Sequence, residues 1–167
     1  MPPHKRIEAD PGAERRVAMC RAAVAGDPRF GVSCVDVDRP GPSFSVDTLR
    51  ALHGQAPGDD LTFIVGGDMA HSLPEWHEPE ALLALAELGV AEREEVRRAD
   101  ILEQIAELAG ARERVRFFSM PRIDISSSDI RERVAGGRPI RHLVPDAVAA
   151  EIAARGYYRP RAGSSVA

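Results

Sequence analysis

Four short apolar runs in this chain alternate with longer stretches whose apolar residues recur at helical spacing. Runs of this length, bounded by Gly, Pro or Asp, are typical of buried strands. Strands separated by helices pair in parallel, because the helix returns the chain to the edge of the sheet from which it started. The pattern therefore predicts an α/β protein with a parallel sheet of Rossmann type. The predicted strands are residues 30–38, 61–65, 89–92 and 115–119.

Apolar periodicity and end signals predict six helices around these strands. Glycine ends several of them, as at Gly26 and Gly110, and proline opens those at Pro79 and Pro145. We expect helices over residues 11–25, 79–88, 96–109 and 145–154. Two more are expected, one from residues 43–45 to 52 and one that starts at residue 126 or 127 and stops at 136–137.

A length of 167 residues with ordinary apolar and charged fractions indicates one domain. We expect it to span residues 1–158, with 159–167 as a flexible tail. The net charge of −4 at pH 7 offers no broad attraction to nucleic acid or to anionic membranes. No apolar run is long enough to cross a membrane, and Cys20 and Cys34 lack metal-ligand spacing. The sequence therefore predicts a cytoplasmic protein with two reduced thiols and no membrane or nucleic-acid partner.

Two segments carry residue types suited to nucleotide chemistry. The strand 61–65 runs into Gly66-Gly67-Asp68, at the strand end where parallel α/β sheets bind ligands. Glycine permits close backbone approach, and the Asp68 carboxylate suits ribose hydroxyls, although a helix-capping Asp would explain it equally. The segment DISSSDIR places a helix start at Ser126 or Ser127, with Ser128 and Arg131 within one turn. Such a start suits phosphate oxygens, although serine also caps helices that bind nothing.

Two further candidates have structural explanations as well. Trp76, the only tryptophan, lies in the proline-interrupted segment LPEWH. Stacking on a flat ligand ring fits such a place, although the residue type alone favours core packing. Ser45 precedes a predicted helix, where capping alone would account for it.

Four blocks of the sequence together resemble the bacterial nicotinate-nucleotide adenylyltransferases in order and spacing. The opening MPPHKR resembles a fifth, so the similarity extends from residue 2 to about residue 158. The four blocks are PSFSVDTLRAL, FIVGGDMAHSLPEWHEPEALLALA, ISSSDIR and RPIRHLVPDAVAAEI.

The resemblance implies a nucleotidyltransferase-type sheet and transfer of AMP from ATP to nicotinate mononucleotide, giving deamido-NAD and pyrophosphate. It implies ATP and Mg²⁺ as the small molecules bound, and it leaves a homo-oligomer open. Lys5 would approach substrate phosphate, and the Trp76 indole would stack on the pyridine ring. By the resemblance, ATP is bound by Gly66, Asp68, Ser127, Ser128 and Arg131, and the mononucleotide by Lys5, Ser45 and Trp76.

One family feature has no match in this sequence. Members begin with a glycine-rich strand-to-helix segment that ends in His-x-Gly-His, and no histidine here lies in such a pair, so the catalytic residues stay unassigned. The resemblance therefore implies that a strand, a helix and a second strand precede Met1, and that the chain as written is inactive alone. The histidines without an assigned role are His4, His53, His71, His77 and His142.

Two other functions stay open from the sequence. A catalytically inactive nucleotide-binding remnant, with a regulatory or partner-binding role, would carry the same phosphate segments. A cytidylyltransferase or a pantetheine-phosphate adenylyltransferase would share the fold, but the LPEW and SFSVDTL segments resemble the nicotinate branch more closely.

Overall fold

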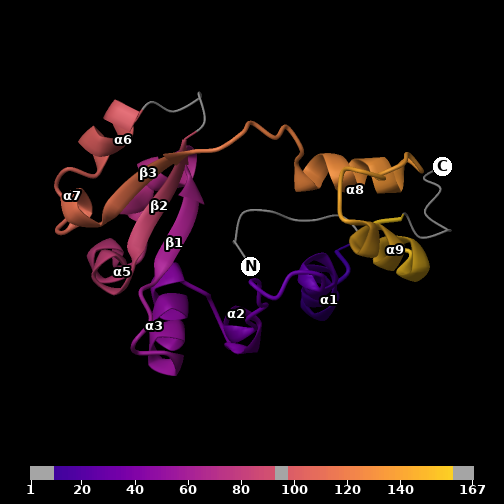
Figure 1. Ribbon diagram of the computed structural model, residues 1–167, viewed down its shortest axis with the longest axis horizontal. Coiled ribbons are helices and arrows are strands. Elements are labelled where there is room, and N and C mark those ends of the chain that lie inside the picture. The colour runs from indigo at the N-terminus through magenta and orange to yellow at the C-terminus, as the bar shows by residue number, and fades with distance from the viewer. Residues whose placement is uncertain (1–9, 93–97, 160–167) are drawn as a thin grey trace. The chain divides into compact units, whose positions relative to one another are not determined.

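A computed structural model describes residues 10–92 and 98–159 of the chain (Figure 1). The chain divides into two compact units. We call Arg39–Arg122 the sheet unit, and Met1–Asp38 together with Ile123–Ala167 the helical unit. The single domain over residues 1–158 stays a prediction, and all but the first residue of the predicted tail lies outside the described residues.

The sheet unit holds three parallel strands in the order β1-β2-β3, so the predicted parallel α/β architecture is confirmed (Figure 1). Val65 of β1 lies opposite Val90 of β2, which in turn lies opposite Phe117 of β3. The strands are β1 (Thr62–Gly66), β2 (Glu87–Glu92) and β3 (Val115–Ser119). Three of the four predicted strands are therefore found, each within two residues of its expected bounds.

Helices of the sheet unit follow the predicted order, with three short additions, α4 (Gly67–His71), the 3₁₀ helix η1 (Leu73–Glu75) and α7 (Ala111–Arg114). The helix predicted over 96–109 ends at Gln104, because tighter turns follow: Ala106 N–H donates to the Glu103 carbonyl and Leu108 N–H to that of Ile105. These turns keep Ile105 fully buried. The other helices are α3 (Ser45–Gln55), α5 (Pro79–Leu85) and α6 (Arg98–Gln104).

One face of the sheet forms the main core. Leu88 and Val90 of β2 are completely buried there among residues of α3, α5 and α6. On the opposite face, the Ile64 side chain is 65% exposed and that of Phe118 is 39% exposed. Gly89 lies between them on β2, where an added Cβ would be 3.3 Å from the Thr62 methyl group and 3.5 Å from each of these two side chains. The missing side chain at Gly89 therefore lets its larger neighbours lie over the middle strand.

The helical unit is held by a second, smaller core. Val134, Ile152 and Tyr157 are buried, and Tyr157 O–H donates to the Glu151 carboxylate at 3.1 Å. Gly156 ends the last helix at φ 65°, a conformation that glycine adopts without strain. The elements are α1 (Ala13–Val24), α2 (Val35–Asp38), α8 (Ser127–Ala135) and α9 (Asp146–Arg155), and α1 packs against α9.

The strand predicted over residues 30–38 is wrong. Residues 31–34 form no regular element, and 35–38 form the single turn α2, which begins with bonds from Val37 and Asp38 N–H to the Cys34 carbonyl. Upstream, the Asp27 carboxylate accepts from Arg29 N–H and the Asp27 carbonyl from Phe30 N–H, and the Ser33 hydroxyl accepts from Val35 N–H. These local bonds occupy backbone groups that a sheet ladder needs.

None of the helices within residues 10–92 and 98–159 combines the length and the apolar content needed to cross a membrane.

Candidate functional site

The C-terminal end of β1 is the first part of the candidate site. Gly66 ends the strand and Gly67 begins α4. A Cβ added to Gly66 would meet no atom within 4 Å, so packing does not require glycine there. Open space at the C-terminal end of a parallel strand is where α/β proteins of this type bind ligands.

Asp68 lies in the first turn of α4 and is exposed. The helix is capped by Gly66, with no side-chain hydrogen bond at its N-terminus, so Asp68 does not act as the capping residue. Its backbone carbonyl accepts from Ser72 N–H at 3.2 Å, and its carboxylate lies at the surface. The carboxylate oxygens of Asp68, two residues after Gly66, can therefore accept hydrogen bonds from a ligand.

Trp76 follows η1 and is partly buried against the main core. Its indole N–H donates to the Ser72 hydroxyl at 3.1 Å. The Phe63 ring of β1 lies nearly perpendicular to the indole, with centroids 6.0 Å apart and an interplanar angle of 82°. The packing expected from residue type alone is thus present, and stacking of the indole on a ligand stays a prediction.

Two contacts join the segment that follows Trp76 to α3. The His77 ring lies on the Phe44 ring, with centroids 4.3 Å apart. The Arg50 guanidinium donates to both carboxylate oxygens of Glu78, at 2.6 and 3.2 Å, and this hydrogen bonding lowers the pKa of Glu78. Glu78 is the N-cap of α5 and adopts φ 50°, which is uncommon for a residue with a side chain. We call these two contacts the α3 clamp.

Ser45 is the first residue of α3, directly after Phe44 of the clamp. Phe44 is the N-cap and the helix start has no side-chain cap hydrogen bond, so Ser45 does not serve as the cap. The side chain is partly buried. The clamp therefore brings the segment carrying Trp76 to the end of α3 where Ser45 lies.

The hydroxyl-rich helix start is confirmed as α8 in the helical unit. Ser126 is the cap, and its hydroxyl accepts from Asp129 N–H at 3.0 Å. Arg131 donates to the Ser128 hydroxyl at 2.9 Å, so its guanidinium lies over the first turn. Because Ser126 makes the cap, the hydroxyls of Ser127 and Ser128 are not used for it. The helix dipole adds positive potential at this end.

The predicted site residues thus fall into two groups. Ser45, Gly66, Asp68 and Trp76 belong to the sheet unit, and Ser127, Ser128 and Arg131 belong to the helical unit. Lys5 lies outside the described residues.

Sequence reasoning missed two contacts around Trp76, the Ser72 hydrogen bond and the place of His77 on Phe44. The spacing of Ser72 and Trp76, four residues apart, is the signal that could have indicated the first.

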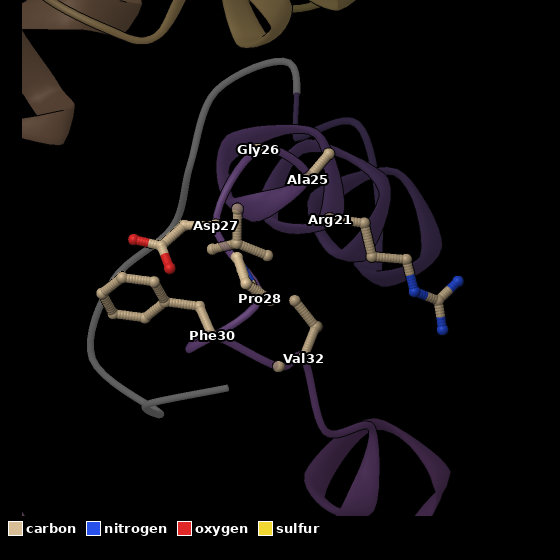
Figure 2. A pocket seen from close by; sticks show the side chains of 9 residues that line it. Arg21, Ala25, Gly26, Asp27, Pro28, Phe30 and Val32 are labelled. Atoms are coloured by element: carbon tan, nitrogen blue, oxygen red, sulfur yellow. The ribbon is translucent and has the colours of Figure 1, made fainter.

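Two surface pockets lie away from these residues. One in the helical unit, about 350 Å³, is lined by Val24, Pro28 and Phe30 (Figure 2). Figure 2 shows the Arg21 guanidinium pointing away from the other labelled side chains, and it donates to the Cys34 sulfur at 3.5 Å. The Asp27 carboxylate beside this pocket is bound by the Arg29 guanidinium at 2.6 Å.

The second pocket, about 440 Å³, lies at the N-terminal end of β1, the opposite end of the strand from Gly66. His53 and Arg114 line it together with Asp59 and Asp60. Among the residues that the structure describes, no group of three or more His, Cys, Asp or Glu side chains is placed to hold a metal ion.

Comparison with known proteins adds a family match. The cytidylyltransferase-like family model matches residues 2–133. A probable nicotinate-nucleotide adenylyltransferase of Thermomicrobium roseum is 44% identical over 158 residues, which cover 95% of this chain and 73% of the relative. The corresponding protein of Roseiflexus sp. is 46% identical over 147 residues, covering 87% of this chain and 72% of the relative.

A solved structure shares the fold. The nicotinic acid mononucleotide adenylyltransferase of Plasmodium falciparum complexed with NaAD superposes with a TM-score of 0.65 at 16% identity, covering 87% of this chain and 74% of the other. The same enzyme complexed with APC gives a TM-score of 0.66.

Proposed function

Because the chain belongs to the cytidylyltransferase-like family and within it to the nicotinate-nucleotide adenylyltransferases, we propose that it transfers AMP from ATP to nicotinate mononucleotide. The products are deamido-NAD and pyrophosphate. The observation in the structure that best supports this proposal is the α3 clamp, which holds the segment carrying the only tryptophan against the start of α3.

The mononucleotide is proposed to bind between Trp76 and Ser45. An indole has one hydrogen-bond donor, and here Ser72 accepts it. What Trp76 offers a ligand is therefore the π face of its ring, which suits stacking on the flat, electron-poor pyridine ring. Ser45, which is not needed as a cap, keeps its hydroxyl for a polar group of the same ligand.

The ATP phosphates are proposed to bind at the start of α8. The Ser128 hydroxyl accepts from Arg131, so its own proton is directed elsewhere and can be donated to a phosphate oxygen. Arg131 uses one donor on Ser128 and has others for a second oxygen. Gly66 and Asp68 are proposed to lie near the nucleotide, with the Asp68 carboxylate accepting from ribose hydroxyls.

The chemistry requires positioning more than covalent catalysis. A phosphate oxygen of the mononucleotide attacks the α-phosphorus of ATP, the bond to the β-phosphate oxygen breaks, and pyrophosphate leaves. Placing two anionic groups in contact is costly, so cationic side chains and helix N-termini would supply most of the rate gain.

Mg²⁺ is proposed as a partner of ATP, where it would neutralise phosphate charge. Mg²⁺ usually keeps several waters and is held largely by substrate phosphates, so ATP itself would supply much of its coordination.

The test is a substrate comparison in the purified protein, made both with the chain as written and with a version extended through any in-frame codons before Met1. Pyrophosphate release is measured with ATP and nicotinate mononucleotide, and in parallel with the amide mononucleotide, with pantetheine phosphate, and with CTP in place of ATP. We expect the pair of ATP and nicotinate mononucleotide to give the highest kcat/KM. ATP binding in calorimetry without turnover of any pair by either version would instead support the nucleotide-binding remnant.

A further inference from the structure

The indole of Trp76 is held by a two-step hydrogen-bond chain. Its N–H donates to the Ser72 hydroxyl at 3.1 Å, and that hydroxyl donates to the Met69 carbonyl of α4, also at 3.1 Å. A hydroxyl has one proton, so the bond to Met69 turns the oxygen lone pairs of Ser72 toward the indole. Ser72 is thus fixed as an acceptor for Trp76.

Ser72 is itself firmly anchored. It is the C-cap of α4, and its N–H donates to the Asp68 carbonyl at 3.2 Å. Backbone and side chain therefore both tie Ser72 to the short helix that begins at the C-terminal end of β1. The orientation of Trp76 is linked through Ser72 to the turn that carries Asp68.

The backbone around Trp76 is also held by hydrogen bonds and contacts, so the freedom that remains is in its side chain. Trp76 N–H donates to the Leu73 carbonyl at 3.0 Å, and the α3 clamp holds the next two residues. The remaining freedom is rotation of the indole about its two side-chain torsions, of which the second has broad wells. The Phe63 contact restricts this rotation, but only the bond to Ser72 depends on which way the N–H points.

We infer that Ser72 is a positioning residue for mononucleotide recognition, holding the Trp76 indole in the orientation in which its face meets the pyridine ring. The inference rests on the proposed function. It assigns Ser72 no contact with the substrate. Its effect would be preorganisation, because an indole already held in place loses less freedom when the ligand binds.

The single tryptophan makes the inference directly measurable, because intrinsic tryptophan fluorescence reports Trp76 alone. The variants are Ser72→Thr and Ser72→Val, which have nearly the same shape and differ in the hydroxyl. Ser72→Ala removes the hydroxyl without adding volume. Ser33→Ala is the matched control, since it removes a serine hydroxyl that accepts a backbone N–H in the other unit.

We expect Ser72→Val and Ser72→Ala to shift the emission maximum of the free protein and to lower its fluorescence anisotropy. Both should weaken nicotinate mononucleotide binding, measured by fluorescence quenching, by about threefold to tenfold, the range for one lost hydrogen bond. Binding of ATP in calorimetry should be unchanged. Ser72→Thr and Ser33→Ala should retain wild-type behaviour in each measurement.

Three results would overturn the inference. One is wild-type mononucleotide affinity in Ser72→Val and Ser72→Ala together with altered fluorescence, which leaves the proposed function intact. Another is an equal loss of mononucleotide and ATP binding in these two variants together with a lowered Tm, which would show that Ser72 supports the fold and not the orientation of Trp76. The third is a wild-type protein whose fluorescence and calorimetry detect no binding of the mononucleotide, and this result alone also removes the proposed function.

Discussion

Removing the Arg131 guanidinium is the sharpest test of where the ATP phosphates bind. Arg131 is partly buried over the first turn of α8 and donates to Ser128 at 2.9 Å, so Arg131→Ala removes one intramolecular bond and a preplaced charge. A charge-assisted hydrogen bond to phosphate contributes about 1.5–3 kcal/mol. The variant should therefore lose about tenfold to 150-fold in kcat/KM for ATP. The kcat/KM of Arg131→Lys for ATP should lie between those of the wild type and Arg131→Ala, because an ammonium keeps the charge but not the planar guanidinium geometry.

The same helix provides the control. Arg133 donates to the Asp129 carboxylate at 3.3 Å, four residues earlier on α8, and is not assigned to the site. Arg133→Ala removes an ion pair of a kind that contributes about 0.3–0.5 kcal/mol, and it should leave ATP kinetics unchanged. Both variants are made in the catalytically complete, extended version and assayed by pyrophosphate release with ATP varied at saturating mononucleotide, and ATP binding is measured by calorimetry. A wild-type ATP profile in Arg131→Ala, or an equal loss in Arg133→Ala, would refute the assignment.

Three further predictions concern the mononucleotide side and the stability of the fold. Trp76→Ala should weaken mononucleotide binding by about 1–3 kcal/mol and leave ATP binding nearly unchanged in calorimetry, and equal losses for both would indicate a purely structural tryptophan. Hydrogen bonding from Arg50 lowers the pKa of Glu78, so the clamp should stabilise the fold fully above the ordinary glutamate value of 4.5 and lose that contribution as pH falls through the lowered pKa. In thermal melts at a series of pH values, Glu78→Gln should lack the part of the acid-induced fall in Tm that this ion pair causes. A fall in Tm of wild-type size in Glu78→Gln would contradict the prediction. Ser126→Ala should cost about 0.5–2 kcal/mol in urea unfolding, whereas Ser127→Ala should cost much less, because only Ser126 caps α8.

Sequence reasoning located the elements whose signals are local and agree with one another. The helix at Ser127 has a hydroxyl cap, an apolar face through Ile130 and Val134, and glycine at its end, and the structure has all three. The strand ending at Gly66 is apolar and bounded by turn residues, and it is found one residue from its expected position.

The failures have a physical cause as well. Over residues 30–38, alternation suggested a strand, but Asp27 and Ser33 offered the backbone closer partners than a distant strand could. Period-two alternation says which side chains share a face and does not say where the N–H groups bond. The bond from Arg50 to Glu78 joins residues 28 apart, and propensity and periodicity carry no information on such a pair.

The contacts around Trp76 also bear on how the protein folds. The bond from Trp76 to Ser72 spans four residues, so closing this loop costs little chain entropy. β3, by contrast, pairs Phe117 with Val90 only after the chain has passed through α6 and α7. Contacts of short separation favour rapid formation. The hydrogen bond that orients the tryptophan is therefore encoded within one short segment, and we expect it to keep its local geometry when substitutions loosen the far edge of the sheet.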